Sequence, residues 1–158
     1  MPTLIRWTTL ASIEPTADSV VPRYLLVEVG GQRFAWELAQ VREIVPGRAV
    51  TRLPGAPAWV LGLINLRGAV LTVVDLGGRF GLPSTGVGTV VVIEADGRML
   101  GVRVDAVRSV ATAEQATLEP VDGARAADGL VRGMVRLATG PAALIDATAL
   151  CRSVLATV

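Results

Sequence analysis

Histidine and lysine are both absent from this chain of 158 residues. Without histidine, no imidazole is available for general acid–base catalysis, for metal binding or for accepting a phosphoryl group. All 15 basic residues are arginines, and 14 acidic residues bring the net charge to only +1. Because the arginines are also scattered, the sequence offers no positive field for nucleic acid or for anionic lipid.

Cysteine and aromatic residues are scarce. The single cysteine, Cys151, excludes an internal disulfide, as is usual in a reducing cytoplasm. It lies in an apolar segment with no histidine partner, which predicts an inert, packed thiol. Aromatic residues make up 4% of a chain that is 51% hydrophobic, so aliphatic side chains must fill the core.

Long apolar runs are also missing. The runs at 59–64 and 87–93 are far shorter than the ~20 residues of a transmembrane helix. Residues 1–22 contain one arginine, two acids and no sustained apolar core, so they do not resemble a secretory signal. We therefore expect a soluble cytoplasmic protein with no direct membrane insertion.

What the chain does contain is a series of short β signals separated by turns. Two-residue turns at Gly30-Gly31 and Asp96-Gly97 predict hairpins, and Arg67-Gly68 joins a third pair of strands. Residues 1–21 are expected to form a loose arm. Residues 111–127 are expected to form a loop that can hold a short helix. The predicted strands are 24–29, 32–37, 41–45, 60–66, 69–76, 89–95, 98–104, 130–137 and 142–146, with a helical turn at 77–82 and a terminal helix at 148–158.

An internal repeat indicates the architecture. A shift of 66 positions superposes residues 31–44 on 97–110, and a shift of 71 superposes 62–75 on 133–146. Two blocks that match in order predict two similar β units of about five strands each, packed as two small barrels. Because neither half alone has a generous core, we expect the barrels to share an apolar seam.

The sequence gives little support to catalysis. Its carboxylates have no metal-ligand spacing, so no metal site and no cofactor are predicted. Asp75 and Asp146 are related by the repeat, and a carboxylate directly after a strand usually caps the turn that follows. No serine lies in a nucleophile elbow, and no phosphate-binding loop is present. The sequence therefore predicts a protein that is not an enzyme.

The most informative segment runs from Leu53 to Leu76. Here a nearly unbroken apolar strand ends at Arg67, which a turn with Gly68 would hold at a fixed angle. A solvated hairpin tip is the simpler interpretation of any one arginine. An arginine rimmed by apolar side chains has the composition of a binding hot spot, and the rim we expect here consists of Trp59, Leu66 and Val70.

This segment resembles the signature of the CheW-like family of chemotaxis coupling proteins. The matching residues are Leu53, Pro54, Pro57, Gly62, Asn65, Leu66, Arg67, Gly68, Asp75 and Leu76. Residues 41–44 and 101–107 are similar to two further motifs of that family, in the same order. The resemblance covers about 24–150. It implies an all-β fold for residues 22–158, with two similar, intertwined five-stranded SH3-like β-barrels and short helices between them and at the C-terminus.

The resemblance also implies a function. Family members are non-enzymatic adaptors that couple chemoreceptors to the histidine kinase CheA, in the cytoplasm at membrane-associated receptor arrays. The kinase regulatory domain binds one barrel, the receptor's cytoplasmic tip binds a groove between the barrels, and other CheW-like domains of the array are further candidate partners. The partner-binding residues carried over are Val41, Glu43, Ile44, Gly62, Asn65, Arg67, Thr89, Val90, Gly101, Val107 and Val110.

For the apolar members of this set, core packing is an equally good interpretation. Glu43 differs, because a charged residue between Val41 and Ile44 should face out of the pleat. Three other functions remain open on the sequence alone. They are an adaptor for a different sensory array, a small ligand-binding or nucleic-acid-binding barrel with a basic groove and exposed aromatics, and an enzyme.

Overall fold

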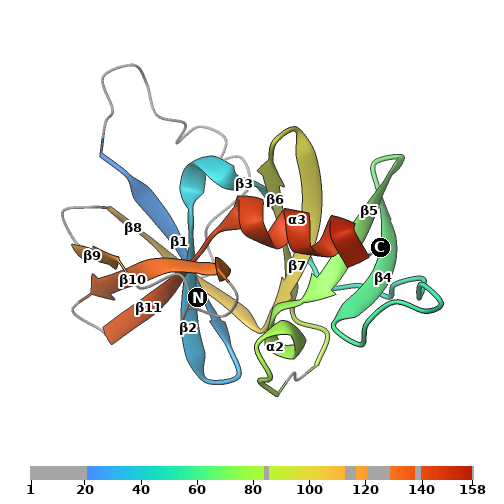
Figure 1. Cartoon of the computed structure of the whole chain (residues 1–158), viewed down its shortest axis with the longest axis horizontal. Helices are drawn as coiled ribbons and strands as arrows, with labels where there is room; N and C mark the ends of the chain where they lie inside the picture. Colours follow the sequence, from blue (N-terminus) through green and yellow to red (C-terminus); the bar gives the residue numbers. More distant parts are fainter. Residues whose placement is uncertain (1–20, 84–85, 113–116, 121–128, 138–139, 158) are drawn as a thin grey trace.

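Strands dominate the computed structural model, which describes residues 21–83, 86–112, 117–120, 129–137 and 140–157 (Figure 1). The helical elements are η1 (Leu38–Gln40), α2 (Leu76–Arg79) and α3 (Ala147–Thr157). Within these ranges, no helix is both long and apolar enough to cross a membrane. The strands are β1 (Arg23–Val29), β2 (Gln32–Glu37), β3 (Val41–Pro46), β4 (Val60–Leu66), β5 (Ala69–Asp75), β6 (Thr89–Ala95), β7 (Arg98–Val104), β8 (Ala106–Thr112), β9 (Thr117–Pro120), β10 (Val131–Leu137) and β11 (Gly140–Ile145).

The strands form two curved sheets that lie side by side, with α3 crossing the front of the junction (Figure 1). We call the sheet β8-β1-β2-β11-β10-β9 barrel 1 and the sheet β3-β6-β7-β5-β4 barrel 2. The predicted all-β fold of two small SH3-like barrels with short helices is confirmed. The predicted arm at residues 1–21 lies, apart from its last residue, outside the described residues.

Two strands, β8 and β9, were not among the predicted ones. Residues 111–127 were expected to form a loop, but β8 extends to Thr112, and β9 adds a sixth strand to barrel 1. β9 pairs antiparallel with residues 133–136 of β10. Its four residues have no clear alternation of their own, so the neighbouring strand decides their conformation. The rest of the expected loop lies outside the described residues.

The barrels do not coincide with the two sequence repeats. One repeat supplies β1–β5 and the other supplies β6–β11. Barrel 1 nevertheless combines β1 and β2 with β8–β11, and barrel 2 combines β3–β5 with β6 and β7. Parallel pairing of β2 with β11, and of β5 with β7, joins the parts contributed by different repeats. The chain therefore crosses between barrels at η1 and again at Asp105, the residue between β7 and β8.

Repeat-related positions share backbone irregularities and ion pairs. A β-bulge bypasses Arg42 where β3 pairs with β6, and another bypasses Arg108 where β8 pairs with β1. Arg42 pairs with Glu94, and Arg108 pairs with Glu28 at 2.6 Å. The shift of 66 relates Arg42 to Arg108 and Glu28 to Glu94. Because bulges set the twist and direction of a strand, this agreement means that the repeat conserves backbone geometry as well as composition.

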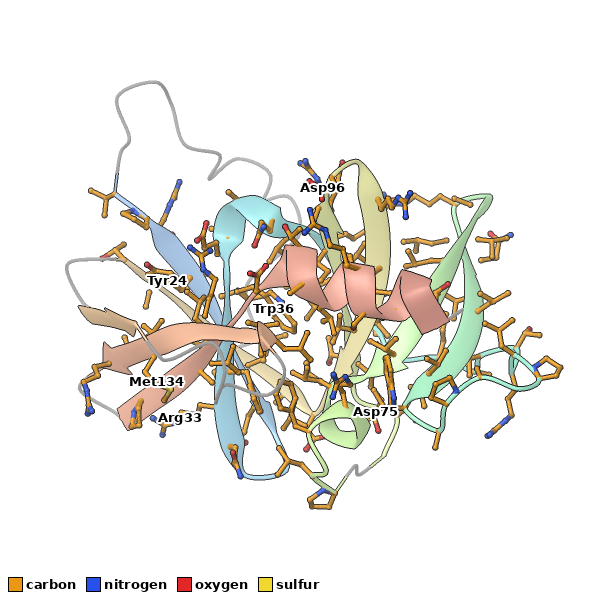
Figure 2. The ribbon with its side chains drawn as sticks, viewed as in Figure 1. Tyr24, Arg33, Trp36, Asp75, Asp96 and Met134 are labelled. Carbon is orange, nitrogen blue, oxygen red and sulfur yellow. The ribbon has the colours of Figure 1, made fainter. Side chains whose placement is uncertain are left out.

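The largest apolar cluster lies between the barrels, and we call it the seam. Strand β1 illustrates how it forms, because Leu25 and Val27 face the seam whereas Tyr24 and Leu26 face the interior of barrel 1. Trp36 of β2 lies fully buried in the seam, behind α3 in Figure 2. A strand buried on both faces needs a nearly continuous run of apolar residues, and β1 has such a run. The seam's α3 members are Ala147, Leu150, Cys151 and Val154.

We expect the two barrels to unfold together. Leu150→Ala should lower the free energy of unfolding by about 2–5 kcal/mol, because it opens a cavity in the seam that both barrels share. Urea titration followed by tryptophan fluorescence and by far-ultraviolet circular dichroism should give coincident single transitions for wild type and variant. Two separate transitions would mean that each barrel has an independent core.

Candidate partner-binding site

Arg67 has a backbone conformation that side-chain-bearing residues rarely adopt. Its φ is 54° and that of Gly68 is 86°, as a two-residue type I′ hairpin requires. Two other two-residue hairpins place Gly30-Gly31 and Asp96-Gly97 at the same positions, where glycine and aspartate fit well. A left-handed conformation costs a long side chain about 1–2 kcal/mol. The Asn65 side chain supports the turn, because its Oδ1 accepts the Gly68 N–H at 2.9 Å.

Glu43 fixes the direction of the Arg67 side chain. Arg67 Nη2 lies 2.5 Å from Glu43 Oε2, and the side chains are 75% and 13% exposed, respectively. Glu43 does not face out of the pleat as expected. It pairs with Val92 and shares a face of β3 with Val45, and both valines belong to the interior of barrel 2. Because of the bulge, Arg42 rather than Glu43 is exposed. Arg67 therefore covers the Glu43 carboxylate, which is largely shielded from solvent.

The ion pair lies where the two edge strands of barrel 2 approach each other. β3 and β4 are the edges of this sheet, and Thr51, after β3, exchanges two backbone hydrogen bonds of 2.8 Å with Leu63. Gly62 makes that approach possible. Its φ is 144°, and a Cβ atom there would lie 2.2 Å from the Thr51 carbonyl oxygen. Gly62 therefore closes the barrel, and it is buried.

Several of the other predicted residues pack inside the protein. Ile44 is 2% exposed in the seam, and Val90 is 3% exposed in the interior of barrel 2. Gly101 is also buried, and a Cβ atom there would lie 3.0 Å from Val90 Cγ1. Thr89 and Val41 are half-buried, and Val41 packs against the seam. For Ile44, Val90 and Gly101, the packing interpretation accounts for the observed position.

Val107 and Val110 lie in barrel 1, on β8, where both are half-buried against the seam. The structure thus brings three predicted residues together at the β4–β5 end of barrel 2, namely Glu43, Asn65 and Arg67. It leaves Val107 and Val110 in the other barrel. We call those three residues, with the turn that carries Arg67, the arginine turn.

The apolar rim around Arg67 differs from the prediction. Val70 is 70% exposed and pairs across the hairpin with Asn65, so it does border the arginine turn. Leu66 packs against the interior of barrel 2. Trp59 precedes β4 and Arg67 follows it, so an extended strand separates them. The Trp59 ring instead lies 5.4 Å from the Arg79 guanidinium carbon.

A buried ion cluster was not predicted. Arg103, 6% exposed, places Nη1 3.4 Å from Asp75 Oδ1 and 3.1 Å from Asp105 Oδ1. Asp75 makes no side-chain capping bond to α2, so the predicted capping role is wrong for it. Its repeat partner Asp146 does cap, because Asp146 Oδ1 accepts the Ala149 N–H at 3.1 Å. The available signal in the sequence was an arginine between two valines at the end of a mostly apolar strand.

The buried thiol of Cys151 has the environment expected of a packing residue. Cys151 is 5% exposed in the seam, and burial, with a smaller contribution from the charge of Asp96, raises its pKa to about 11 from an ordinary 9.0.

Among the described residues, no group of three His, Cys, Asp or Glu side chains is placed to hold a metal ion.

Cys151 should therefore react slowly in the folded protein. A pKa of about 11 leaves roughly a hundredfold less thiolate at pH 8 than the ordinary value would. Labelling with the disulfide reagent DTNB at pH 8 should be at least that much slower than in urea, and it should accelerate as pH rises toward 11. Equal rates in native and denatured protein would contradict this account.

Gly62 provides a test of whether its role is structural. Gly62→Ala should lower the free energy of unfolding by ~3 kcal/mol or more, because a methyl group would meet the Thr51 carbonyl. Gly55→Ala is the matched control, since Gly55 also has positive φ, +81°, but has nothing within 4 Å. That change should cost about 1–2 kcal/mol. If urea titrations show equal losses of unfolding free energy for Gly62→Ala and Gly55→Ala, Gly62 has no special role in closing the barrel.

Comparison with known proteins agrees with this architecture. Residues 23–155 match the model of the CheW-like domain family. The chemotaxis protein CheW of Rhizobium meliloti (strain 1021) is 40% identical over 95 residues, which are 58% of this chain and 61% of the relative. The chemotaxis protein CheW of Klebsiella aerogenes is 28% identical over 143 residues, covering 87% of this chain and 86% of the relative.

The fold also has a solved counterpart. The scaffolding protein TtCheW from Thermoanaerobacter tengcongensis superposes with a TM-score of 0.71 at 24% identity, covering 82% of this chain and 92% of that one. At this identity the likeness concerns the fold. The family model spans most of the chain, including both barrels and α3 up to residue 155. This chain therefore belongs to the CheW-like domain family.

Proposed function

We propose that this protein is a non-enzymatic adaptor that couples chemoreceptors to the histidine kinase CheA at membrane-associated arrays in the cytoplasm. Family membership supports an adaptor, and the relatives are named as chemotaxis and scaffolding proteins. The observation that carries the proposal in this chain is the arginine turn. It holds an exposed arginine in a strained conformation on a supported hairpin.

Strain of this kind persists only where the surroundings impose it, and it concentrates at functional sites. Here two side chains maintain the geometry, because Asn65 holds the turn and Glu43 holds the guanidinium. An arginine that is already oriented loses less conformational entropy when a partner binds, so its contacts contribute more to affinity. The neighbouring Val70, 70% exposed, supplies apolar surface beside the charge.

An adaptor also needs a second surface. Val107 and Val110 lie on barrel 1 against the seam, away from the arginine turn at the β4–β5 end of barrel 2. We assign the two surfaces to two partners, the regulatory domain of the kinase and the cytoplasmic tip of the receptor. A helical tip fits an apolar groove between barrels. Each interface would be at the lower end of the ~1,200–2,000 Å² class, with array formation adding avidity.

In this mechanism the protein performs no chemistry. It holds kinase and receptor in a fixed register, so that movement of the receptor tip changes kinase activity. Neighbouring CheW-like domains in the array are further partners. The buried, protonated thiol of Cys151 and the ion-paired carboxylate of Asp75 fit this mechanism, since neither is presented as a reactive group at the surface.

Arg67 is the residue whose loss tests the proposal. Arg67→Ala should weaken partner binding by about 1–3 kcal/mol. Thermal stability should change little, because an ion pair with one exposed member contributes at most about 1 kcal/mol. Calorimetric titration with the isolated regulatory domain of the kinase from the same genome measures the first effect, and a thermal melt measures the second. The receptor tip is titrated in parallel.

Two further variants sharpen the experiment. Arg67→Asn keeps a residue that accepts the left-handed turn, so it should lose binding as Arg67→Ala does while folding at least as well. Arg152→Ala removes another exposed arginine, 76% exposed and paired with Asp96, and should bind like wild type. If the wild type binds neither partner at high micromolar concentration, the adaptor proposal fails. A large loss of stability with intact binding would make Arg67 structural.

A further inference from the structure

The seam alone does not fix how one barrel is oriented against the other. Its contacts are apolar, and apolar burial is non-directional. Directional contacts between the barrels are needed to select one arrangement. A group of such contacts lies at the second crossing of the chain, around Asp105.

Asp105 bonds to barrel 1 through both its backbone and its side chain. Its N–H donates to the Glu28 carbonyl at 3.0 Å, and its Oδ2 accepts the Gly30 N–H at 2.8 Å. These are the end of β1 and the β1–β2 turn. The other carboxylate oxygen, Oδ1, faces the Arg103 guanidinium at 3.1 Å. One side chain therefore connects barrel 1 to an arginine of barrel 2.

Arg103 in turn ties together separate parts of barrel 2. Besides pairing with Asp75 at the end of β5, its Nη2 donates to the Gly86 carbonyl at 2.7 Å. Gly88 lies against the guanidinium, because a Cβ atom there would lie 3.0 Å from Arg103 Cζ. The arginine side chain is only 7% exposed. Its position is thus set by β5, by the segment before β6 and by the chain crossing.

The cluster is remote from the arginine turn. Asp75 and Arg67 lie at opposite ends of β5, and Figure 2 shows Asp75 beside α2, at the other end of barrel 2 from Asp96. Buried ion pairs often contribute little net stability compared with apolar replacements, and some of them serve to select one arrangement. A role in geometry therefore suits this cluster better than a role in raw stability.

We infer that Arg103 and Asp105 are positioning residues that lock the angle between the barrels. This inference rests on the proposed adaptor function for its consequence: the lock keeps the two partner surfaces in one register. Without it, each surface still binds its own partner, but movement of the receptor is no longer transmitted to the kinase.

Spin labels on the full-length protein test the lock directly, without any partner. Ser109→Cys on barrel 1 and Val70→Cys on barrel 2, in a Cys151→Ala background, report the inter-barrel distance by pulsed electron resonance. The unlocked variant is Asp105→Ala, which should broaden a narrow distance distribution. Asp105→Asn keeps an acceptor for Gly30 but loses the charge that faces Arg103, so its distribution should be broader than that of wild type and narrower than that of Asp105→Ala. Glu94→Gln, which removes an ion pair within barrel 2, is the matched control and should change nothing.

A second readout addresses signalling. Asp105→Ala should keep the wild-type affinity for the isolated kinase domain but lose receptor control of the kinase in a reconstituted array. An unchanged distance distribution in folded Asp105→Ala and Asp105→Asn overturns the lock. If Asp105→Ala does not fold, Asp105→Asn carries the distance test alone. Failure of wild type to bind any partner would instead defeat the proposed function and leave the distance result standing.

Discussion

The exchange of strands between the two repeats is the constraint on which the rest of this structure depends. Neither repeat forms a barrel by itself, because barrel 1 combines two strands of the first repeat with four of the second, and barrel 2 combines three strands of the first with two of the second. The strands at the junction must then be apolar on both faces, as β1 is. That requirement produces the seam, and the seam in turn gives α3 its apolar docking surface. A small β protein with few aromatic residues obtains in this way a core larger than either barrel could supply.

The sequence predicted the elements well because their signals are local. Glycine-rich turns, alternating strands and the two matching shifts located nearly every strand, and the repeat predicted two barrels with a common seam. The repeat could not show which strands pair, since pairing depends on contacts far apart in the chain. The same limit explains β9, whose conformation is imposed by β10. It also explains the capping error at Asp75, where a buried arginine from another strand competes with the local turn.

The candidate site, like the fold, was predicted only in part from the sequence. The family motif located Arg67 and Glu43, but the bulge at Arg42 reversed the side on which Glu43 lies. A bulge leaves no clear signal in the amino-acid composition. The strict alternation of side chains along a strand therefore predicted the wrong face of β3 for Glu43. Several motif residues, such as Gly62 and Gly101, are explained by close backbone or side-chain approach. Their presence in the motif is explained by the packing of the barrel, whereas the Arg67 side chain is 75% exposed and has no such packing role.

The proposed adaptor function depends on rigidity, and this chain has two sources of it that act differently. The apolar seam supplies most of the cohesion, but its apolar contacts carry no preferred direction. Hydrogen bonds and ion pairs at Asp105 and Arg103 do carry direction, and they lie where the chain passes from one barrel to the other. Placing a costly buried charge at a crossing is hard to explain by stability alone. It is readily explained if the quantity that the protein must maintain is an angle.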